Sequence, residues 1–286
     1  MSLSVSRPVV ILHGWSDDAA SFEPLARRLA EEGRRPLPLW LGDYVSMDDD
    51  VTLPDIAQRL ERALHEKMAQ GLLHAPFDMV VHSTGGLVAR QWLVSYDQRR
   101  VPGRWLQRLV MLAPANHGSK LAATGKSMIG RLTAGLGNWL QTGTQVLSAL
   151  ELGSPYQWGL ALQDVLHEPS LGDAGPPVYG ERGCLPFVLT GTRGYESLLR
   201  RVLNEEGADG VVRAPAANLW ARGATLDFSL DEHEPVFTSW NTRDDLGPYA
   251  LALLDDEDHS AIVKAERATT WRCLMQALDC PMDALA

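Results

Sequence analysis

Residues 77–90 of this chain read Phe-Asp-Met-Val-Val-His-Ser-Thr-Gly-Gly-Leu-Val-Ala-Arg. The first five are mostly apolar and partly β-branched, and Pro76 bounds them, so they predict a short buried strand. A helical pattern starts directly after Ser83, with Leu87 and Val88 at positions expected to be buried. The stretch therefore predicts a strand that turns abruptly into a helix with a serine at the corner.

A serine at such a corner suits nucleophilic chemistry. Its hydroxyl is a poor nucleophile until a base removes the proton, so the oxygen must stand clear of the sheet and within reach of a histidine. The start of the helix offers N–H groups to a developing oxyanion. The usual pattern at this corner is G-x-S-x-G, and here Val81 occupies the first glycine position. A plain glycine-rich turn is the alternative interpretation.

The length and composition limit the possible number of domains, the class of partner and the state of the cysteines. The length of 286 residues allows one large α/β domain with an insertion, or two small domains. The net charge of −10 argues against nucleic acid as a partner, because phosphate binding requires a basic surface. The three cysteines, an odd and sparse set, predict free thiols rather than a disulfide framework: Cys184, Cys273 and Cys280.

No targeting or membrane segment is expected. The N-terminal residues lack a secretory pattern, and no apolar run approaches the length of a bilayer span. We therefore expect a cytoplasmic protein, with export by a signal-free route left open.

Strands and helices alternate along most of the chain. Apolar runs predict strands at 9–12, 37–41, 106–112, 185–190, 226–230 and 251–254, the second near a sheet edge because of its two prolines. Helical patterns lie between them, including one over 195–206 and a last one over about 261–278. This alternation predicts right-handed βαβ units and a doubly wound, mostly parallel sheet.

Residues 119–183 depart from this alternation of strands and helices. Glycines punctuate the stretch, and no strand pattern separates its helical patterns. One apolar helical face consists of Met128, Ile129, Leu132, Leu136, Trp139 and Leu140, and a second helix is indicated by Val146, Leu147 and Leu150. We therefore expect a core of residues 1–118 and 184–286, with residues 119–183 inserted above the sheet as a helical cap or lid. Permanent packing of the apolar face on the core is the alternative.

Two further residues fit a nucleophilic serine. His259 follows an apolar run and precedes a helix near the C-terminus, where a base is expected, and Asp209 lies in a turn where its carboxylate could orient that histidine. Asp227 and Asp231 are rival acids, whereas Asp258 is a poor one because adjacent side chains diverge. We interpret His82 as a structural hydrogen-bonding residue.

The sequence resembles the α/β-hydrolase superfamily, most of all the bacterial triacylglycerol lipase and esterase branch. The resemblance covers nearly the whole chain and rests on His13-Gly14-Trp15, residues 81–85, Pro114-Ala-Asn-His-Gly-Ser119, Asp209-Gly210-Val-Val and Asp258-His259. It implies the α/β-hydrolase fold and a catalytic Ser83, Asp209 and His259. It further implies that the N–H groups of Trp15 and Thr84 bind the oxyanion.

The resemblance implies a serine ester hydrolase that acts on a small-molecule or lipid ester without a cofactor. Transient contact with a lipid interface is a further expectation. Some lipases of this kind carry a calcium site near the histidine, but its ligands cannot be matched here, and we expect no metal. The alternatives are a phospholipase, thioesterase, amidase or acyltransferase using the same residues, or a silent binding module. The oligomeric state is left open.

Overall fold

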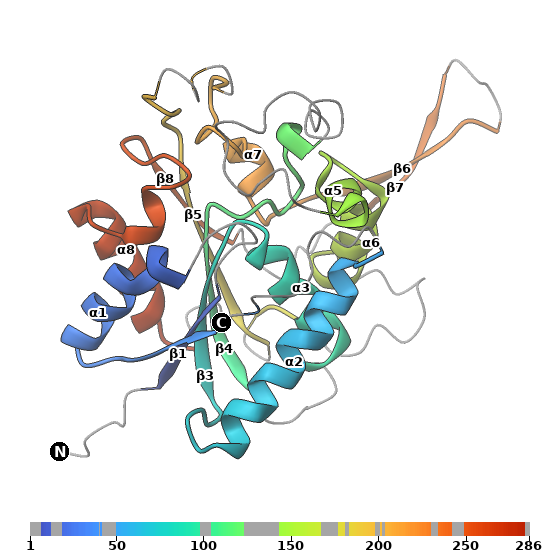
Figure 1. The fold of residues 1–286 in the computed structure, drawn as a ribbon. Helices are drawn as coiled ribbons and strands as arrows, with labels where there is room; N and C mark the ends of the chain where they lie inside the picture. The colour runs from blue at the N-terminus through green and yellow to red at the C-terminus, as the bar shows by residue number, and fades with distance from the viewer. Residues whose placement is uncertain are drawn as a thin grey trace.

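One parallel sheet organises the structure, which is a computed structural model. It describes residues 7–12, 19–39, 41, 50–97, 104–122, 143–166, 177–180, 183–197, 201, 204–229, 234–241 and 249–283. Six strands lie in the order β2–β1–β3–β4–β5–β8, and every neighbouring pair is parallel (Figure 1). Their bounds are β1 Pro8–Leu12, β2 Arg35–Leu39, β3 Phe77–His82, β4 Leu106–Leu112, β5 Leu185–Gly191 and β8 Ala250–Leu254. The predicted doubly wound, mostly parallel sheet is confirmed, and proline-bearing β2 is an edge strand as expected.

Helices cover both faces of the sheet. Helices α1 (Glu23–Glu31) and α8 (Ala268–Asp279) lie on one face, and α2 (Leu53–Ala69) and α3 (Gly85–Ser95) lie on the other (Figure 1). Alternate strand residues accordingly enter two different apolar cores. After β1 the chain moves outward to β2 and then returns past β1 to β3. The carboxyl ends of β1 and β3 therefore flank the switch point where open α/β sheets bind ligands.

Helix α2 shows how the sequence specifies an element locally. Its Thr52 cap and Asp55 form a reciprocal capping box, and Pro54 occupies the first turn, where no intrahelical N–H is needed. Its buried side chains recur at spacings of three and four residues: Leu53, Ile56, Ala57, Leu60 and Leu64. This stripe packs α2 against the sheet beside α3.

Helices α5 and α6 lie between β4 and β5, in the stretch predicted as an insertion. Helix α5 (Thr144–Leu150) covers the second predicted helix, and α6 (Pro155–Asp164) follows it and packs against both α5 and α3. The chain's other predicted helical face, from Met128 to Leu140, lies outside the described residues.

A hairpin projects from the body of the molecule. After the short helix α7 (Ala214–Ala217), strands β6 (Gly223–Asp227) and β7 (Val236–Asn241) pair antiparallel with each other and with no other described strand. The pair extends away from the sheet and helices (Figure 1). The predicted strand at 226–230 overlaps β6 but lies about three residues too far along.

Two predicted helices are corrected. Helix α8 begins at Ala268 rather than near Ala261, because Ala265 adopts a left-handed conformation (φ 47°) after a single 3-10 turn. Of the predicted helix at 195–206, residues 195–197 and 204–206 are not helical, and residues 198–200, 202 and 203 lie outside the described residues. The Asn204 side chain bonds both the main-chain N–H and the C=O of Tyr195, so the two ends of this segment lie close together.

Candidate active site

Ser83 stands at the corner between β3 and α3. Its backbone φ of 54° is unusual for a residue with a side chain, and the Ser83 N–H donates to the Leu112 carbonyl at the end of β4 (3.0 Å). Val81 enters the core and pairs in register with Leu12 and Met111. The sharp corner therefore forms with valine at the position where the usual pattern has glycine.

Close packing behind the corner does require a glycine. A Cβ atom added to Gly86 would lie 2.9 Å from the Pro114 Cβ, too close for an unperturbed contact. Helix α3 thus approaches the loop after β4 closely, and this loop carries the 114–119 motif singled out in the sequence. The motif in turn reaches the turn at 209–212, because the Ser119 hydroxyl donates to the Val211 carbonyl (2.5 Å).

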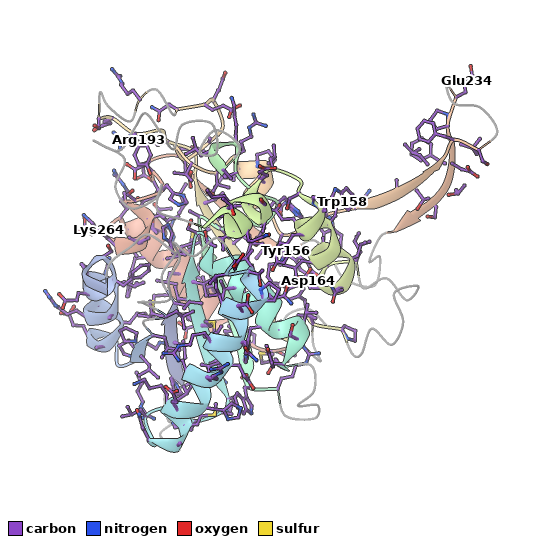
Figure 2. The ribbon with its side chains drawn as sticks, turned by 45° about the vertical axis from the view of Figure 1, so that its right-hand side comes forward. Tyr156, Trp158, Asp164, Arg193, Glu234 and Lys264 are labelled. Atoms are coloured by element: carbon purple, nitrogen blue, oxygen red, sulfur yellow. The ribbon has the colours of Figure 1, made fainter. Side chains whose placement is uncertain are left out.

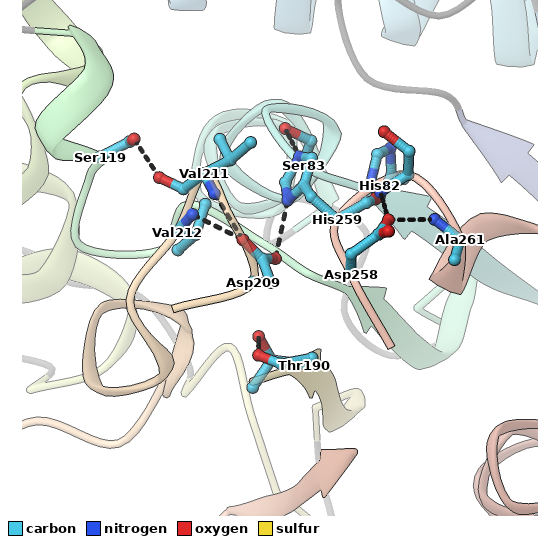
Figure 3. Close-up of polar contacts among 12 residues, drawn as sticks. His82, Ser83, Ser119, Thr190, Asp209, Val211, Val212, Asp258, His259 and Ala261 are labelled. Atoms are coloured by element: carbon cyan, nitrogen blue, oxygen red, sulfur yellow. Dashed lines mark hydrogen bonds and ion pairs between the residues drawn. The ribbon is translucent and has the colours of Figure 1, made fainter. Parts of the chain in front are cut away.

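His259 reaches the serine from the loop after β8. Its Nε2 lies 3.1 Å from the Ser83 Oγ, and its side chain is 2% exposed (Figure 3). The preceding Asp258 shapes this loop, since its Oδ1 accepts from the main-chain N–H groups of Ser260 and Ala261 (2.9 and 2.8 Å). Asp258 therefore points away from the imidazole, as its adjacent position in the sequence predicts.

Asp209 completes the hydrogen-bonded chain from the opposite side of the imidazole. Its Oδ2 lies 2.8 Å from His259 Nδ1, and its Oδ1 accepts from the N–H groups of Val211 and Val212 (2.9 and 2.7 Å; Figure 3). The carboxylate is fully buried. An ionised carboxylate only accepts hydrogen bonds, so the imidazole proton resides on Nδ1 and Nε2 is left to accept from the serine.

The main chain reinforces this arrangement. The His259 N–H donates to the Asp209 carbonyl (2.9 Å), and His82 Nε2 donates to the His259 carbonyl (3.0 Å). The rings of His82 and His259 also contact each other, with centroids 4.7 Å apart. His82 thus links the end of β3 to the histidine loop through a structural hydrogen bond, in agreement with its interpretation from the sequence.

The rival acids lie elsewhere or outside the described residues. Asp227 belongs to the projecting hairpin, where its Oδ1 accepts from the Ser229 N–H (2.8 Å) and hydrogen bonding to Ser229 lowers its pKa. Asp231 is outside the described residues. His117 lies in the 114–119 loop, where burial and the Arg90 charge lower its pKa to about 4 and keep the ring neutral at pH 7.

Of the two predicted oxyanion donors, only Thr84 is described. It is the N-cap residue of α3 and is 4% exposed. Its main-chain N–H donates to no group within the described part of the chain. Trp15 and the whole of His13-Gly14-Trp15 lie outside the described residues.

A buried polar cluster behind α3 was not foreseen from the sequence. Arg90 bonds both carboxylate oxygens of Asp164 on α6 (2.7 and 3.0 Å), and it also donates to the Asn116 carbonyl (2.7 Å). The Tyr179 hydroxyl donates to the same Asp164 (2.9 Å). Burial opposes the charge on Arg90, but the adjacent carboxylate outweighs this and raises its pKa. No local pattern could predict a pair separated by 74 positions.

Neither a metal centre nor a membrane span is found among the residues that the structure describes. Their His, Cys, Asp and Glu side chains form no group of three or more able to hold a metal ion. No described helix combines the length and apolar character needed to cross a bilayer. Among the acidic residues 255–258, Glu257 is 1% exposed and accepts from the Thr270 hydroxyl (2.6 Å).

Comparison with known proteins gives structural relatives only. No protein-family model and no curated protein sequence matches the chain. Among solved structures, phospholipase PlaB from Legionella pneumophila is 28% identical with a TM-score of 0.73, over 96% of this chain and 59% of PlaB. Lipase BlEst2 from Bacillus licheniformis, in its mature form, is 16% identical with a TM-score of 0.62, over 96% of this chain and 93% of the lipase. The metagenomic carboxyl esterase MGS0156 is 16% identical with a TM-score of 0.55, over 96% of this chain and 75% of that protein. The chain thus spans less than two thirds of PlaB.

Proposed function

We propose that this chain, which has the α/β-hydrolase fold, is a serine ester hydrolase of the lipase or carboxylesterase type. The observation that carries the proposal is the continuous hydrogen-bonded chain from Ser83 through His259 to Asp209. All three side chains are buried where β3, β5 and β8 end or in the loops that follow. This arrangement supports the proposed roles of Ser83 as nucleophile, His259 as base and Asp209 as the acid that orients the imidazole.

In the proposed mechanism the Ser83 oxygen attacks the acyl carbonyl carbon while His259 Nε2 takes the hydroxyl proton. Asp209 holds the imidazole with its proton on Nδ1 and stabilises the cation that forms. The carbonyl oxygen becomes an oxyanion, for which the N–H groups of Thr84 and Trp15 are the proposed donors. Collapse of the intermediate breaks the ester C–O bond, and His259 returns the proton to the departing alcohol. Water then attacks the acyl-enzyme by the same steps and releases the acid.

A phospholipase is the second candidate. PlaB is a phospholipase, and it is more similar to this chain in identity and TM-score than BlEst2 or MGS0156. Cleavage of an acyl ester in a phospholipid would use the same triad, because the bond and the tetrahedral intermediate are the same. The two candidates differ only in the alcohol part of the substrate.

The helical insertion is proposed to act as a cap over the site, with residues 119–183 set against a core of 1–118 and 184–286. Its described helix α6 is anchored to α3 by the buried Arg90–Asp164 pair. The two side chains are 0% exposed, so separating them would leave a buried charge without its partner. Opening of a lid in this protein would therefore leave α6 in place.

Labelling with a fluorophosphonate probe tests the proposal, because only an activated serine reacts with it. We expect the wild-type protein to be labelled on Ser83, and Ser83→Ala to lose labelling together with roughly 10⁴-fold of its ester hydrolysis. Ser260→Ala is the matched control, because Ser260 is an exposed serine that follows His259 in the same loop, and this variant should react normally. An unlabelled wild-type protein would favour a silent binding module, and retained turnover in Ser83→Ala would exclude the assignment.

A substrate panel then separates the two candidates. Hydrolysis of p-nitrophenyl esters and triglycerides is compared with hydrolysis of phosphatidylcholine and phosphatidylglycerol, each with the Ser83→Ala protein as the blank. A preference for the phospholipids by tenfold or more in kcat/KM would identify a phospholipase. The opposite preference would identify a lipase or carboxylesterase.

A further inference from the structure

The side chain of His82 joins the strand that carries the nucleophile to the proposed base. His82 is the last residue of β3, directly before Ser83, and it is 3% exposed. Its Nε2 lies 3.0 Å from the main-chain carbonyl oxygen of His259 (Figure 3). A carbonyl oxygen only accepts, so Nε2 of His82 carries the proton of this bond. The end of β3 is thus bonded directly to the main chain of the base.

This bond connects two parts of the sheet that are not neighbours. The strand order places β4 and β5 between β3, which leads into Ser83, and β8, which leads into His259. The two strands are three strand spacings of about 4.8 Å apart, or roughly 14 Å. The position of the base relative to the nucleophile therefore depends on the contacts that hold the loops beyond the strand ends.

Other main-chain bonds hold the histidine loop, residues 255–261, from the side of β5. The N–H of Arg193, just after β5, donates to the Glu257 carbonyl (3.2 Å), and the N–H of the base itself donates to the Asp209 carbonyl (2.9 Å). Figure 2 shows Arg193 apart from Tyr156 on the cap helix α6. These bonds fix the loop relative to β5 and the acid turn, whereas the His82 bond fixes it relative to the nucleophile strand.

The bond between His259 and Ser83 cannot hold the base throughout the proposed reaction. In the acyl-enzyme the serine oxygen belongs to an ester and has no hydrogen to donate. Nε2 of His259 must then take a proton from water while the water oxygen bonds to the acyl carbon. That proton passes to the Ser83 oxygen as its bond to the acyl carbon breaks. The His82 bond involves none of these atoms, so it is kept through both half-reactions.

We propose that His82 is a positioning residue that keeps His259 in place during deacylation, a role that rests on the proposed function. Its hydrogen bond fixes the main chain of the base, and its ring contacts the base's imidazole, with centroids 4.7 Å apart. A misplacement of about 1 Å can cost roughly 10²-fold in rate. Loss of the bond should therefore slow the step in which the serine hydroxyl no longer helps to hold the imidazole.

A role in packing alone predicts a different pattern. His82 also contacts Phe22, with ring centroids 6.0 Å apart, and it shapes the end of the strand before Ser83. If this were its whole contribution, replacing it would misplace the nucleophile. Acylation and deacylation both pass through a tetrahedral intermediate on Ser83, so the two half-reactions would then slow together.

Two substitutions separate the hydrogen bond from the ring. His82→Phe keeps an aromatic ring but removes the donor, and His82→Gln places an N–H donor the same number of bonds from the main chain without a ring. Hydrolysis of a p-nitrophenyl ester suits the test, because its good leaving group makes acylation fast and deacylation limits kcat. The initial burst of p-nitrophenol and kcat/KM then report acylation.

We expect His82→Phe to lower kcat by roughly 30- to 100-fold, with kcat/KM and the burst rate within about fivefold of wild type, so that KM falls together with kcat. His82→Gln should bring kcat back to within about fivefold of wild type. His65→Phe is the matched control, because it makes the same change on α2 at a side chain that is 58% exposed. It should leave both kinetic parameters within about twofold of wild type.

Several results would overturn the positioning role while leaving the proposed function intact. One is a His82→Phe protein in which kcat and kcat/KM fall equally, and another is an unchanged kcat. A His82→Gln protein as slow as His82→Phe, with normal thermal unfolding in both, would show that the ring rather than the hydrogen bond matters. A wild-type protein without ester turnover would instead overturn the proposed function, and the positioning role with it.

Discussion

Replacing Asp209 with asparagine reverses one hydrogen bond in the proposed triad without changing the shape of the side chain. The orientation of the new amide is fixed by the structure. Oδ1 of Asp209 accepts from the N–H groups of Val211 and Val212, so the amide oxygen must occupy that position. The amide NH₂ then takes the place of Oδ2, 2.8 Å from His259 Nδ1.

The consequence is the wrong imidazole tautomer. An NH₂ group donates, so Nδ1 of His259 has to accept and the ring proton moves to Nε2. Nε2–H then faces the Ser83 oxygen at 3.1 Å and cannot take its proton. We expect a loss of roughly 10³- to 10⁴-fold in kcat/KM, or about 4 to 5 kcal/mol of transition-state stabilisation. The folded structure should be retained, because the hydrogen bonds to Val211 and Val212 are kept.

The assay is hydrolysis of a p-nitrophenyl ester, with thermal unfolding measured in parallel. Asp258→Asn is the matched control, because its amide oxygen can still accept from the N–H groups of Ser260 and Ala261. We expect it to stay within about threefold of wild type. Activity of Asp209→Asn within tenfold of wild type, in a protein with normal thermal unfolding, would refute the tautomer argument and the role of Asp209.

Three further outcomes are expected. If the proposed cap holds an acyl chain, kcat/KM should rise by up to about fourfold per methylene from acetate to at least medium-chain esters, since each buried CH₂ contributes about 0.8 kcal/mol. An equal kcat/KM on all chain lengths would count against an acyl pocket. The lowered pKa of His117, about 4 against an ordinary value of 6.5, means that its contribution to stability is complete above pH 6.5 and is lost as the pH falls toward 4. Between pH 7 and 4, the free energy of unfolding measured with urea should therefore fall by about 3 kcal/mol less in His117→Gln than in the wild-type protein. An unchanged pH dependence would exclude a buried neutral ring. Arg90→Met alone should destabilise the protein by about 3 to 5 kcal/mol because it leaves Asp164 buried and unpaired. The double variant Arg90→Met/Asp164→Leu should recover most of this loss. Equal instability of both variants would show that packing rather than charge dominates.

The sequence predicted best what depends on local pattern. The apolar runs between helical stripes identified the parallel sheet, and the proline-bearing run at 37–41 was correctly placed at its edge. The resemblance to the α/β-hydrolase superfamily is confirmed at the level of the fold. The sequence also selected Ser83, Asp209 and His259, which the structure brings within hydrogen-bond distance of one another. Their catalytic roles stay a prediction.

What the sequence missed depends on contacts between distant residues or on single backbone conformations. The start of α8 is set by the left-handed Ala265, and alanine gives no signal for that conformation. The turn near Tyr195 is closed by an amide nine positions away, although the local residues suit a helix. The Arg90–Asp164 pair joins two helices that periodicity treats separately. In each case tertiary contacts override local propensity.

The four hydrogen bonds to His259 have a consequence for stereochemistry. Its ring nitrogens are bound to Asp209 and Ser83, and its peptide N–H and C=O are bound to Asp209 and His82, so the imidazole cannot swing to follow a departing group. In the proposed mechanism the alcohol oxygen must instead come to Nε2, on one fixed side of the serine. A secondary alcohol then presents its two unequal substituents to a chiral surface in a set order. Racemic esters of such alcohols should therefore be resolved, with one enantiomer consumed faster than its mirror image.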